Sequence, residues 1–205
     1  MNKNFLNKVL VFDNIISKEL SDKIENELLG PYFPWYMTKH EDDKGNYLTS
    51  VNTQLLKFKN NKKIIDNGQL VHTFLKEESS NIVKSLYFNL SLEIIELFIK
   101  KMNIKNIKIL RIKSNMKPYS TKFKKNSFGI PHKDYEKQHY VMIYYVNDSD
   151  GDTFLFDNEK DLKIIKSVEP KKGRILFFDG KILHSAGNPV KNNYRVIINY
   201  NFTIE

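Results

Sequence analysis

The sequence predicts an α+β domain whose β part is a sandwich or a small barrel. Apolar residues in the first half recur about every four positions, as they do along helices. The second half instead holds short runs of β-branched and aromatic residues separated by turns. The chain has 205 residues, of which 40% are apolar, and no repeat or linker divides it. Helices followed by evenly spaced strands therefore predict a single domain of the α+β class.

The N-terminal part is expected to supply a strand and supporting helices. Residues 9–12 are uniformly apolar and predict a short buried strand. Either Ser17 or Ser21 can cap a helix whose apolar positions lie four apart and which ends before Gly30. Residues 31–36 hold two prolines among aromatic residues and cannot be helical, and residues 40–46 read as a polar loop.

A second helical pattern is expected from about Ser80 to Met102. Its apolar positions include Ile82, Leu86 and Leu90, and Ser91 is a plausible cap for a further helix within it. The period then changes to two at residues 107–112, which predicts a strand, and a loop follows at about residues 117–125. The remaining predicted strands are 140–146, 153–156, 164–168, 175–178 and 195–202.

Composition limits the classes of partner. The formal charge of +9 is compatible with a nucleic-acid surface, but only three of the 33 basic residues are arginine, the usual reader of guanine and phosphate. The absence of cysteine excludes disulfides and thiolate metal sites. No apolar run is long enough to span a bilayer and the first residues do not resemble a signal peptide, so we expect a cytoplasmic protein without a membrane partner.

The segment GIPHKDY, residues 129–135, raises the question of a metal site. His132 and Asp134 are two residues apart, and Pro131 favours an extended chain, so both side chains should point to one side. Two imidazoles and one carboxylate on one face of a metal are typical of non-haem Fe(II) oxygenases. The third ligand should come from a later strand, and downstream only His139 and His184 are available.

His184 is the better third ligand, because His139 is expected to begin the next strand. Arg195 follows eleven residues after His184 on an apolar strand, where a buried guanidinium needs an anion. Each feature has an ordinary alternative: a lone His-x-Asp pair is commonly surface polarity, and a lone His184 or Arg195 can serve a turn or a surface acid. All four residues, His132, Asp134, His184 and Arg195, in this order along the chain are much less likely to occur by chance.

These residues resemble the 2-oxoglutarate- and Fe(II)-dependent dioxygenases, in particular the prolyl-hydroxylase-like branch and its small phage-type members. The segments that carry the resemblance are HKD, MIYYVNDSDGDTFLFD and VEPKKGRILFFDGKILHSAGNPV, with a fainter likeness over residues 9–36. The resemblance implies a double-stranded β-helix (jelly-roll, cupin-like) core over residues 106–205, with a strand and supporting helices in residues 1–105, in one domain over 1–205. The chain departs from the family pattern at Asp152, where a second glycine is common.

The resemblance also implies the roles of individual residues. His132, Asp134 and His184 would hold Fe(II), and Arg195, Tyr145 and Thr153 would bind the distal carboxylate of 2-oxoglutarate. Asn115 falls where relatives place a further polar contact to this co-substrate. The implied cofactors are Fe(II), 2-oxoglutarate and O₂, with ascorbate as an accessory reductant.

The expected reaction is hydroxylation of a C–H bond with release of succinate and CO₂. The expected substrate is peptidyl, with proline as one candidate, and a free small molecule stays open. The alternatives are a nucleobase-modifying dioxygenase and a catalytically inactive metal-binding jelly-roll module. If the chain is encoded by a phage, its compartment would be the host cytoplasm. Residues 117–127, 32–36 and 41–47 are candidates for the substrate lid, although aromatic residues such as Trp35 and its neighbours more often serve burial and would then pack the N-terminal helix onto the barrel.

Overall fold

The computed structural model describes residues 9–38, 68–77 and 82–205. The helices in this part of the chain are α1 (Lys18–Leu28) and α3 (Phe88–Met102). The strands are β1 (Leu10–Phe12), β2 (Tyr36–Thr38), β3 (Gln69–Glu77), β4 (Ile82–Lys84), β5 (Ile107–Pro118), β6 (Tyr140–Tyr145), β7 (Thr153–Phe156), β8 (Ile164–Val168), β9 (Ile175–Asp179), β10 (Leu183–Ala186) and β11 (Tyr194–Ile204). The loop expected at residues 40–46 lies outside the described residues.

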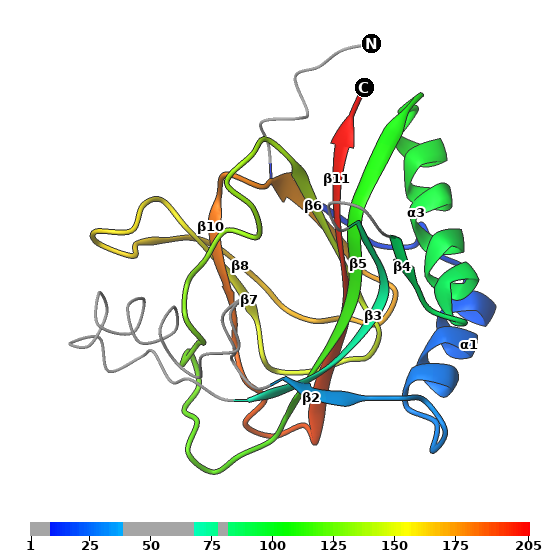
Figure 1. The fold of residues 1–205 in the computed structure, drawn as a ribbon. Helices are drawn as coiled ribbons and strands as arrows, with labels where there is room; N and C mark the ends of the chain where they lie inside the picture. Colours follow the sequence, from blue (N-terminus) through cyan, green and yellow to red (C-terminus); the bar gives the residue numbers. More distant parts are fainter. Residues whose placement is uncertain (1–8, 39–67, 78–81) are drawn as a thin grey trace.

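The strands form two antiparallel sheets, with the helices along one face of the larger sheet (Figure 1). The large sheet has the strand order β1-β9-β6-β11-β5-β3-β2, and β4 pairs with β3. The small sheet has the order β10-β7-β8 and lies on the side away from the helices. The space between the two sheets is the interior of the double-stranded β-helix, so side chains on the inner face of each strand meet there.

Alternate side chains along each central strand point to opposite faces of the large sheet, so the sheet separates two hydrophobic cores. On β6, the residues Met142 and Tyr144 pack with the helices, whereas Val141, Ile143 and Tyr145 face the small sheet. The other central strands follow the same rule, because each is covered by helices on one face and by the small sheet on the other. The near-continuous apolar sequences of β6 and β9 reflect burial on both faces.

Helix α1 forms as its sequence predicts. The side chain of Ser17 accepts a hydrogen bond from the backbone N–H of Leu20 at 3.2 Å, so Ser17 rather than Ser21 is the N-cap. Ser21, Ile24 and Leu28 form its buried face. The indole N–H of Trp35 donates to the carbonyl of Leu28 at 2.9 Å, so this aromatic residue packs the end of the helix.

The helical prediction for residues 80–102 is wrong at its start. Residues Ile82–Lys84 form strand β4, which pairs with β3, and α3 begins only at Phe88. The four-residue spacing is misleading here, because Ile82 is 68% and Leu86 100% exposed and neither belongs to a buried face. Ser91 is not a cap but lies inside the helix, where its hydroxyl donates to the carbonyl of Phe88 at 2.7 Å.

Strand β3 has no counterpart among the predicted strands, and it extends the large sheet beyond β5. Its sequence QLVHTFLKE alternates poorly, since a bulge inserts Phe74 between the paired positions Thr73 and Leu75. Its partner β5 begins about 30 residues further along the chain. The local sequence pattern therefore gives little indication that β3 is a strand. Within the described residues, no helix has the length and apolar character needed to cross a membrane.

Truncation of Phe98 tests how strongly α3 contributes to the fold. Phe98 is fully buried and contacts the rings of Phe12 and Phe177 at centroid distances of 5.9 and 5.4 Å. Phe98→Ala should reduce the free energy of unfolding by about 3–5 kcal/mol, because it leaves a cavity between helix and sheet. Chemical denaturation measures this reduction. The control Glu96→Ala, on the exposed face of the same helix, should change it by less than about 0.5 kcal/mol.

Candidate active site

His132 and His184 are brought together by backbone pairing. The two residues form an antiparallel bridge, with N–H to O=C distances of 2.9 and 3.0 Å in the two directions. His184 belongs to β10, and the segment before Asp134 lies beside that strand. The imidazole centroids are 4.8 Å apart as a result. From the sequence, His184 is expected just after a strand, whereas it lies within the short strand β10.

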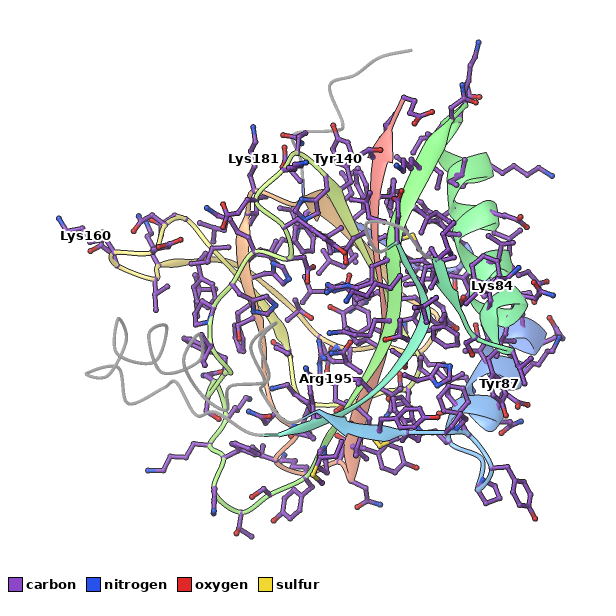
Figure 2. The ribbon with its side chains drawn as sticks, in the orientation of Figure 1. Lys84, Tyr87, Tyr140, Lys160, Lys181 and Arg195 are labelled. Carbon is purple, nitrogen blue, oxygen red and sulfur yellow. The ribbon has the colours of Figure 1, made fainter. Side chains whose placement is uncertain are left out.

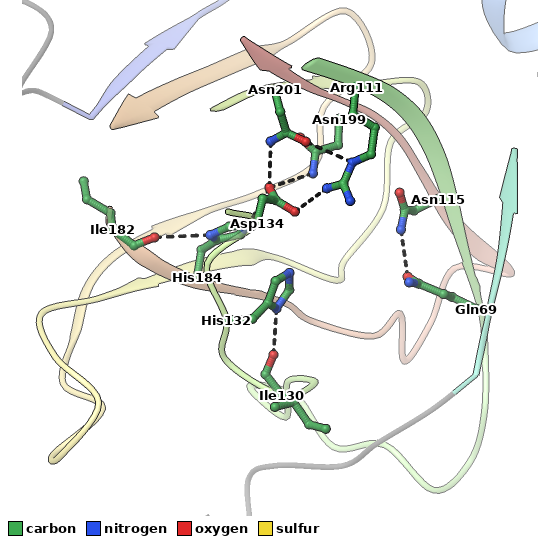
Figure 3. A network of polar contacts seen from close by, with 10 residues as sticks. All are labelled: Gln69, Arg111, Asn115, Ile130, His132, Asp134, Ile182, His184, Asn199 and Asn201. Carbon is green, nitrogen blue, oxygen red and sulfur yellow. Dashed lines mark hydrogen bonds and ion pairs between the residues drawn. The ribbon is translucent and has the colours of Figure 1, made fainter. Parts of the chain in front are cut away.

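Asp134 completes a cluster of three possible metal ligands. One ligand atom from each of His132, Asp134 and His184 lies within 4.8 Å of the others. Figure 3 shows the three side chains converging on one place at the inner face of the barrel. His139, the alternative third ligand, does not join them: it is buried directly before β6 and packs over Gly180.

Both histidines present Nε2 to this centre. The Nδ1 of His132 lies 2.9 Å from the carbonyl of Ile130, and the Nδ1 of His184 lies 3.2 Å from that of Ile182. A carbonyl only accepts, so each Nδ1 donates a hydrogen bond, and Nε2 is the ring nitrogen that is left to bind a metal. Burial, with the nearby His132, lowers the pKa of His184 to about 4, so this imidazole is neutral at pH 7, as a metal ligand must be.

The carboxylate of Asp134 is held by three donors from the large sheet (Figure 3). Arg111 donates to Oδ1 at 2.6 Å, and the amides of Asn199 and Asn201 donate to Oδ2 at 3.1 and 2.9 Å. Arg111 also donates through Nε to the side-chain oxygen of Asn201 at 3.1 Å, which fixes the orientation of that amide. A carboxylate has about four lone-pair positions, so one remains for a metal.

These contacts keep Asp134 ionised. Burial by itself would raise the pKa of this carboxyl group. The interactions with His184 and Arg111 and the hydrogen bond from Asn199 outweigh burial, and the pKa lies well below its usual range. Since His184 is neutral at pH 7, the permanent charge of Arg111 carries most of this effect there.

A second cluster forms around Arg195, which is 1% exposed on β11 (Figure 2). Its guanidinium donates to the carbonyl of Gly151 at 2.6 Å and to the hydroxyl of Thr153 at 2.7 Å. The hydroxyl of Tyr145 donates to the same Thr153 oxygen at 2.7 Å. Burial raises the pKa of Tyr145 to about 12, so the phenol stays protonated. All three residues that the resemblance assigns to one carboxylate therefore lie together.

The two clusters share the inner face of the barrel. His184 pairs with Leu155 on β7, and Thr153 is two residues along the same strand, on the same face. On β11, Asn199 follows Arg195 by four residues, which separates the two positions by about 13 Å along the strand. Asn115 also lies on this face, opposite Ile197, but its amide donates to Gln69 at 3.0 Å rather than joining the Arg195 cluster.

The residues present fit both an iron ion and 2-oxoglutarate. Two imidazoles and one ionised carboxylate form the donor set that non-haem Fe(II) prefers. Among the described residues, the hydrogen-bond partners of the Arg195 guanidinium are neutral oxygens, so a buried positive charge lacks a counter-ion. A dicarboxylate whose far end reaches Arg195 would supply that anion.

Sequence reasoning missed Arg111, Asn199 and Asn201 as supports of Asp134. One sequence signal could have revealed the two asparagines. Arg195, Asn199 and Asn201 are spaced by four and two residues along the largely apolar strand β11, so their side chains lie on the same face. A bulge in β5 skips one residue, Leu110, immediately before Arg111. Bulges beside active sites commonly redirect a side chain, and this one precedes the arginine that reaches Asp134.

The lid candidates have different outcomes. Within residues 117–127, the side chains of Lys117, Phe123 and Ser127 are buried, whereas most of the others are exposed. The ring of Phe33 packs edge-on against Trp35 at a centroid distance of 5.1 Å, which supports the packing role for this aromatic segment. Tyr32, however, is 90% exposed. Residues 41–47 lie outside the described residues.

Replacing Arg111 tests its role as a positioning residue. Arg111→Met should weaken the binding of Mn(II) about 10- to 100-fold, because Asp134 loses its charged partner and its fixed orientation. Arg111→Lys should recover part of the affinity, since it restores the charge but not the bond to Asn201. Titration of the metal-free protein measures this. Arg174→Met is the control, because Arg174 pairs with Asp13 outside the barrel. Unchanged affinity in Arg111→Met would contradict the assignment.

Comparison with known proteins agrees with this geometry. Residues 118–203 match the family described as the 2OG-Fe(II) oxygenase superfamily, where 2OG denotes 2-oxoglutarate. The matched region contains His132, Asp134, His184 and Arg195. No curated protein matches the chain in sequence.

Solved structures share the fold over nearly the whole chain. An oxidoreductase of the 2OG-Fe(II) oxygenase family from Burkholderia pseudomallei is 11% identical with a TM-score of 0.65, covering 96% of this chain and 85% of that one. A prolyl hydroxylase from Trichoplax adhaerens, in complex with a peptide fragment, is 14% identical with a TM-score of 0.62, covering 98% and 86%. A non-haem α-ketoglutarate-dependent epimerase from nogalamycin biosynthesis is 9% identical with a TM-score of 0.61, covering 98% and 79%.

The fold predicted from the sequence is thus confirmed, and these neighbours carry out different reactions on it. Residues 118–203, which contain both clusters, match the 2OG-Fe(II) oxygenase superfamily, and the candidate site fits an Fe(II)- and 2-oxoglutarate-dependent oxygenase.

Proposed function

We propose that the protein hydroxylates a C–H bond of a peptidyl substrate, with a prolyl residue as the first candidate, and releases succinate and CO₂. The observation that carries the oxygenase site is the convergence of His132, Asp134 and His184 to within 4.8 Å. The peptidyl substrate is supported by the fold shared with the peptide-bound prolyl hydroxylase. We also propose that residues 1–205 act as one domain, because β1 and β3 pair into the same sheet as β11.

In this proposal the two clusters hold the cofactors. His132, Asp134 and His184 bind the iron, and Arg195 with Tyr145 and Thr153 binds the distal carboxylate of 2-oxoglutarate. When bound, iron and co-substrate supply the oxidising chemistry. The large sheet keeps Asp134 ionised, and Phe178 packs edge-on against the His184 ring at 5.1 Å, which fixes this imidazole and keeps water away from it.

The test begins with the co-substrate alone. Protein reconstituted anaerobically with Fe(II) and 2-oxoglutarate and then exposed to O₂ should form succinate slowly, and addition of the correct substrate should accelerate it. Peptide libraries with and without proline are screened for this acceleration and for a mass gain of one oxygen atom. Ascorbate is included in one arm to show whether it sustains turnover.

Single-stranded oligonucleotides form the parallel arm of the same assay. If only these accelerate succinate formation, the peptidyl proposal is wrong and the nucleobase alternative replaces it. A steep salt dependence of oligonucleotide binding would accompany that result, because neutralised phosphates release counterions. Absence of succinate under all conditions would contradict the catalytic assignment and favour a metal-binding module.

A further inference from the structure

The inner face of β5 carries basic and polar side chains in a row. Arg111, Lys113, Asn115 and Lys117 alternate with residues that face the helix side. In the pairing with β11 they lie opposite Asn201, Asn199, Ile197 and Arg195, in that order. The row therefore runs from the Asp134 end of the site to the Arg195 end.

Lys113 is the member of this row whose charge the described residues leave unmatched. Arg111 binds Asp134, and Lys117 lies 3.4 Å from the side-chain oxygen of Asn188. No hydrogen bond or ion pair within residues 9–38, 68–77 and 82–205 involves the amine of Lys113. Burial, and then the charge of Arg111, lowers the pKa of this amine to about 8, so it remains largely protonated at pH 7.

Two acceptors beside Lys113 also lack partners. The side-chain oxygens of Asn115 and Asn199 are buried and accept no hydrogen bond in the described part of the chain. Asn199 is paired with Lys113 across the strands, and Asn115 is two residues further along the same face. The Asn199 amide cannot be reversed without turning its oxygen toward Asp134. Buried polar groups in folded proteins normally have partners, so an unmatched donor and two unmatched acceptors indicate a polar ligand.

The charges around Lys113 indicate whether that ligand should be positively or negatively charged. Arg111 on β5 and Lys76 on β3 add positive charge near the amine, and Asp134 supplies the negative charge. The carboxylate of Asp134 already has three donors and belongs to the metal centre. A ligand that reaches Lys113 is therefore favoured if it brings its own negative charge.

We propose that the substrate of this enzyme carries a carboxylate that binds the ammonium group of Lys113, with a neighbouring N–H or O–H group that donates to Asn199 or Asn115. The inference rests on the proposed function and names the substrate class for the same site. In a peptide, the carboxylate would come from an Asp or Glu side chain or from the C-terminus. The same chemistry could come from the 1-carboxylate of 2-oxoglutarate, so the experiment separates these two sources.

The probes are propionate and propionamide, which have similar shape and differ in charge. Each is titrated into full-length protein loaded with Zn(II) and saturating 2-oxoglutarate, and its binding to the protein is followed by ligand-observed saturation-transfer NMR. Calorimetry measures 2-oxoglutarate affinity separately. The variants are Lys113→Met and Lys113→Gln, with Lys160→Met as the control on an exposed turn.

The wild-type protein should bind propionate about tenfold or more tightly than propionamide. Both Lys113 variants should lose this preference while retaining 2-oxoglutarate affinity within about twofold, and Lys160→Met should behave as wild type. If 2-oxoglutarate affinity falls about tenfold in the Lys113 variants and propionate does not bind the saturated wild type, the carboxylate is that of the co-substrate and the substrate assignment is overturned.

The wild-type comparison keeps the inference testable if a variant does not fold. Equal binding of propionate and propionamide to the wild-type protein overturns the inference without any substitution. Retention of the preference in a folded Lys113 variant also overturns it. Failure of 2-oxoglutarate to bind the wild type would instead count against the proposed function, so the two failures can be told apart.

Discussion

His132→Ala should abolish 2-oxoglutarate turnover and metal binding while leaving the fold intact. The substitution removes one of three side chains that converge to within 4.8 Å, and the ring's hydrogen bond within the described residues is the one to Ile130. Removing a residue that merely supports a metal ligand typically costs about 10- to 100-fold in affinity, so removing the ligand itself should cost more. Mn(II) titration and succinate formation measure the two effects.

Lys133→Ala is the matched control, because Lys133 stands between the two candidate ligands and is exposed. It should keep metal affinity and succinate formation close to wild type. Near-normal succinate formation by His132→Ala would show that the ligand assignment is wrong. A thermal melt of both metal-free variants shows whether the effect of His132→Ala comes from unfolding.

Arg195→Met should weaken the binding of 2-oxoglutarate by about 2–5 kcal/mol, which corresponds to a decrease of roughly 30-fold or more. The guanidinium is 1% exposed, and it donates hydrogen bonds to the neutral oxygens of Gly151 and Thr153. Arg195→Met loses these two hydrogen bonds but also removes the cost of burying a charge that lacks a counter-ion among the described residues, so the two effects on stability oppose each other. The metal-free variant should therefore melt near the wild-type temperature but gain less stability from the co-substrate.

A neutral-tailed analogue sharpens this test. 2-Oxovalerate lacks the distal carboxylate and should bind wild type and Arg195→Met with similar affinity, so a double-mutant-style cycle isolates the arginine–carboxylate interaction. Calorimetry on Zn(II)-loaded protein supplies all four affinities. Arg174→Met, which removes an arginine paired with Asp13 outside the barrel, should leave both ligands unaffected. An unchanged 2-oxoglutarate affinity in Arg195→Met would contradict the proposed role.

The strands of the barrel are largely predictable because their signals are local. β7 and β8 lie at the predicted residues, and β6, β9 and β11 differ from prediction by no more than about two residues at either end. Short runs of β-branched and aromatic residues bounded by turns mark such strands directly. β3 and β4 escape prediction because one carries a bulge and the other is an exposed edge strand, and neither shows clean alternation.

The main residues of the candidate site can be proposed from the sequence alone. His132 and Asp134 stand two residues apart in an extended segment, and one later histidine and one buried arginine complete the set. That much follows from side-chain identity, spacing and strand alternation, all of which act over a few residues.

The support of the site, and the other side chains that face it, depend on the tertiary fold. Arg111 and Asn201 reach Asp134 from positions 23 and 67 residues away, and Lys113 faces Asn199 across paired strands. These contacts depend on which strands pair and in which register, and a shift of one residue would turn Lys113 and Arg195 away from the interior. Register is set by packing of the whole barrel, so no local pattern contains it.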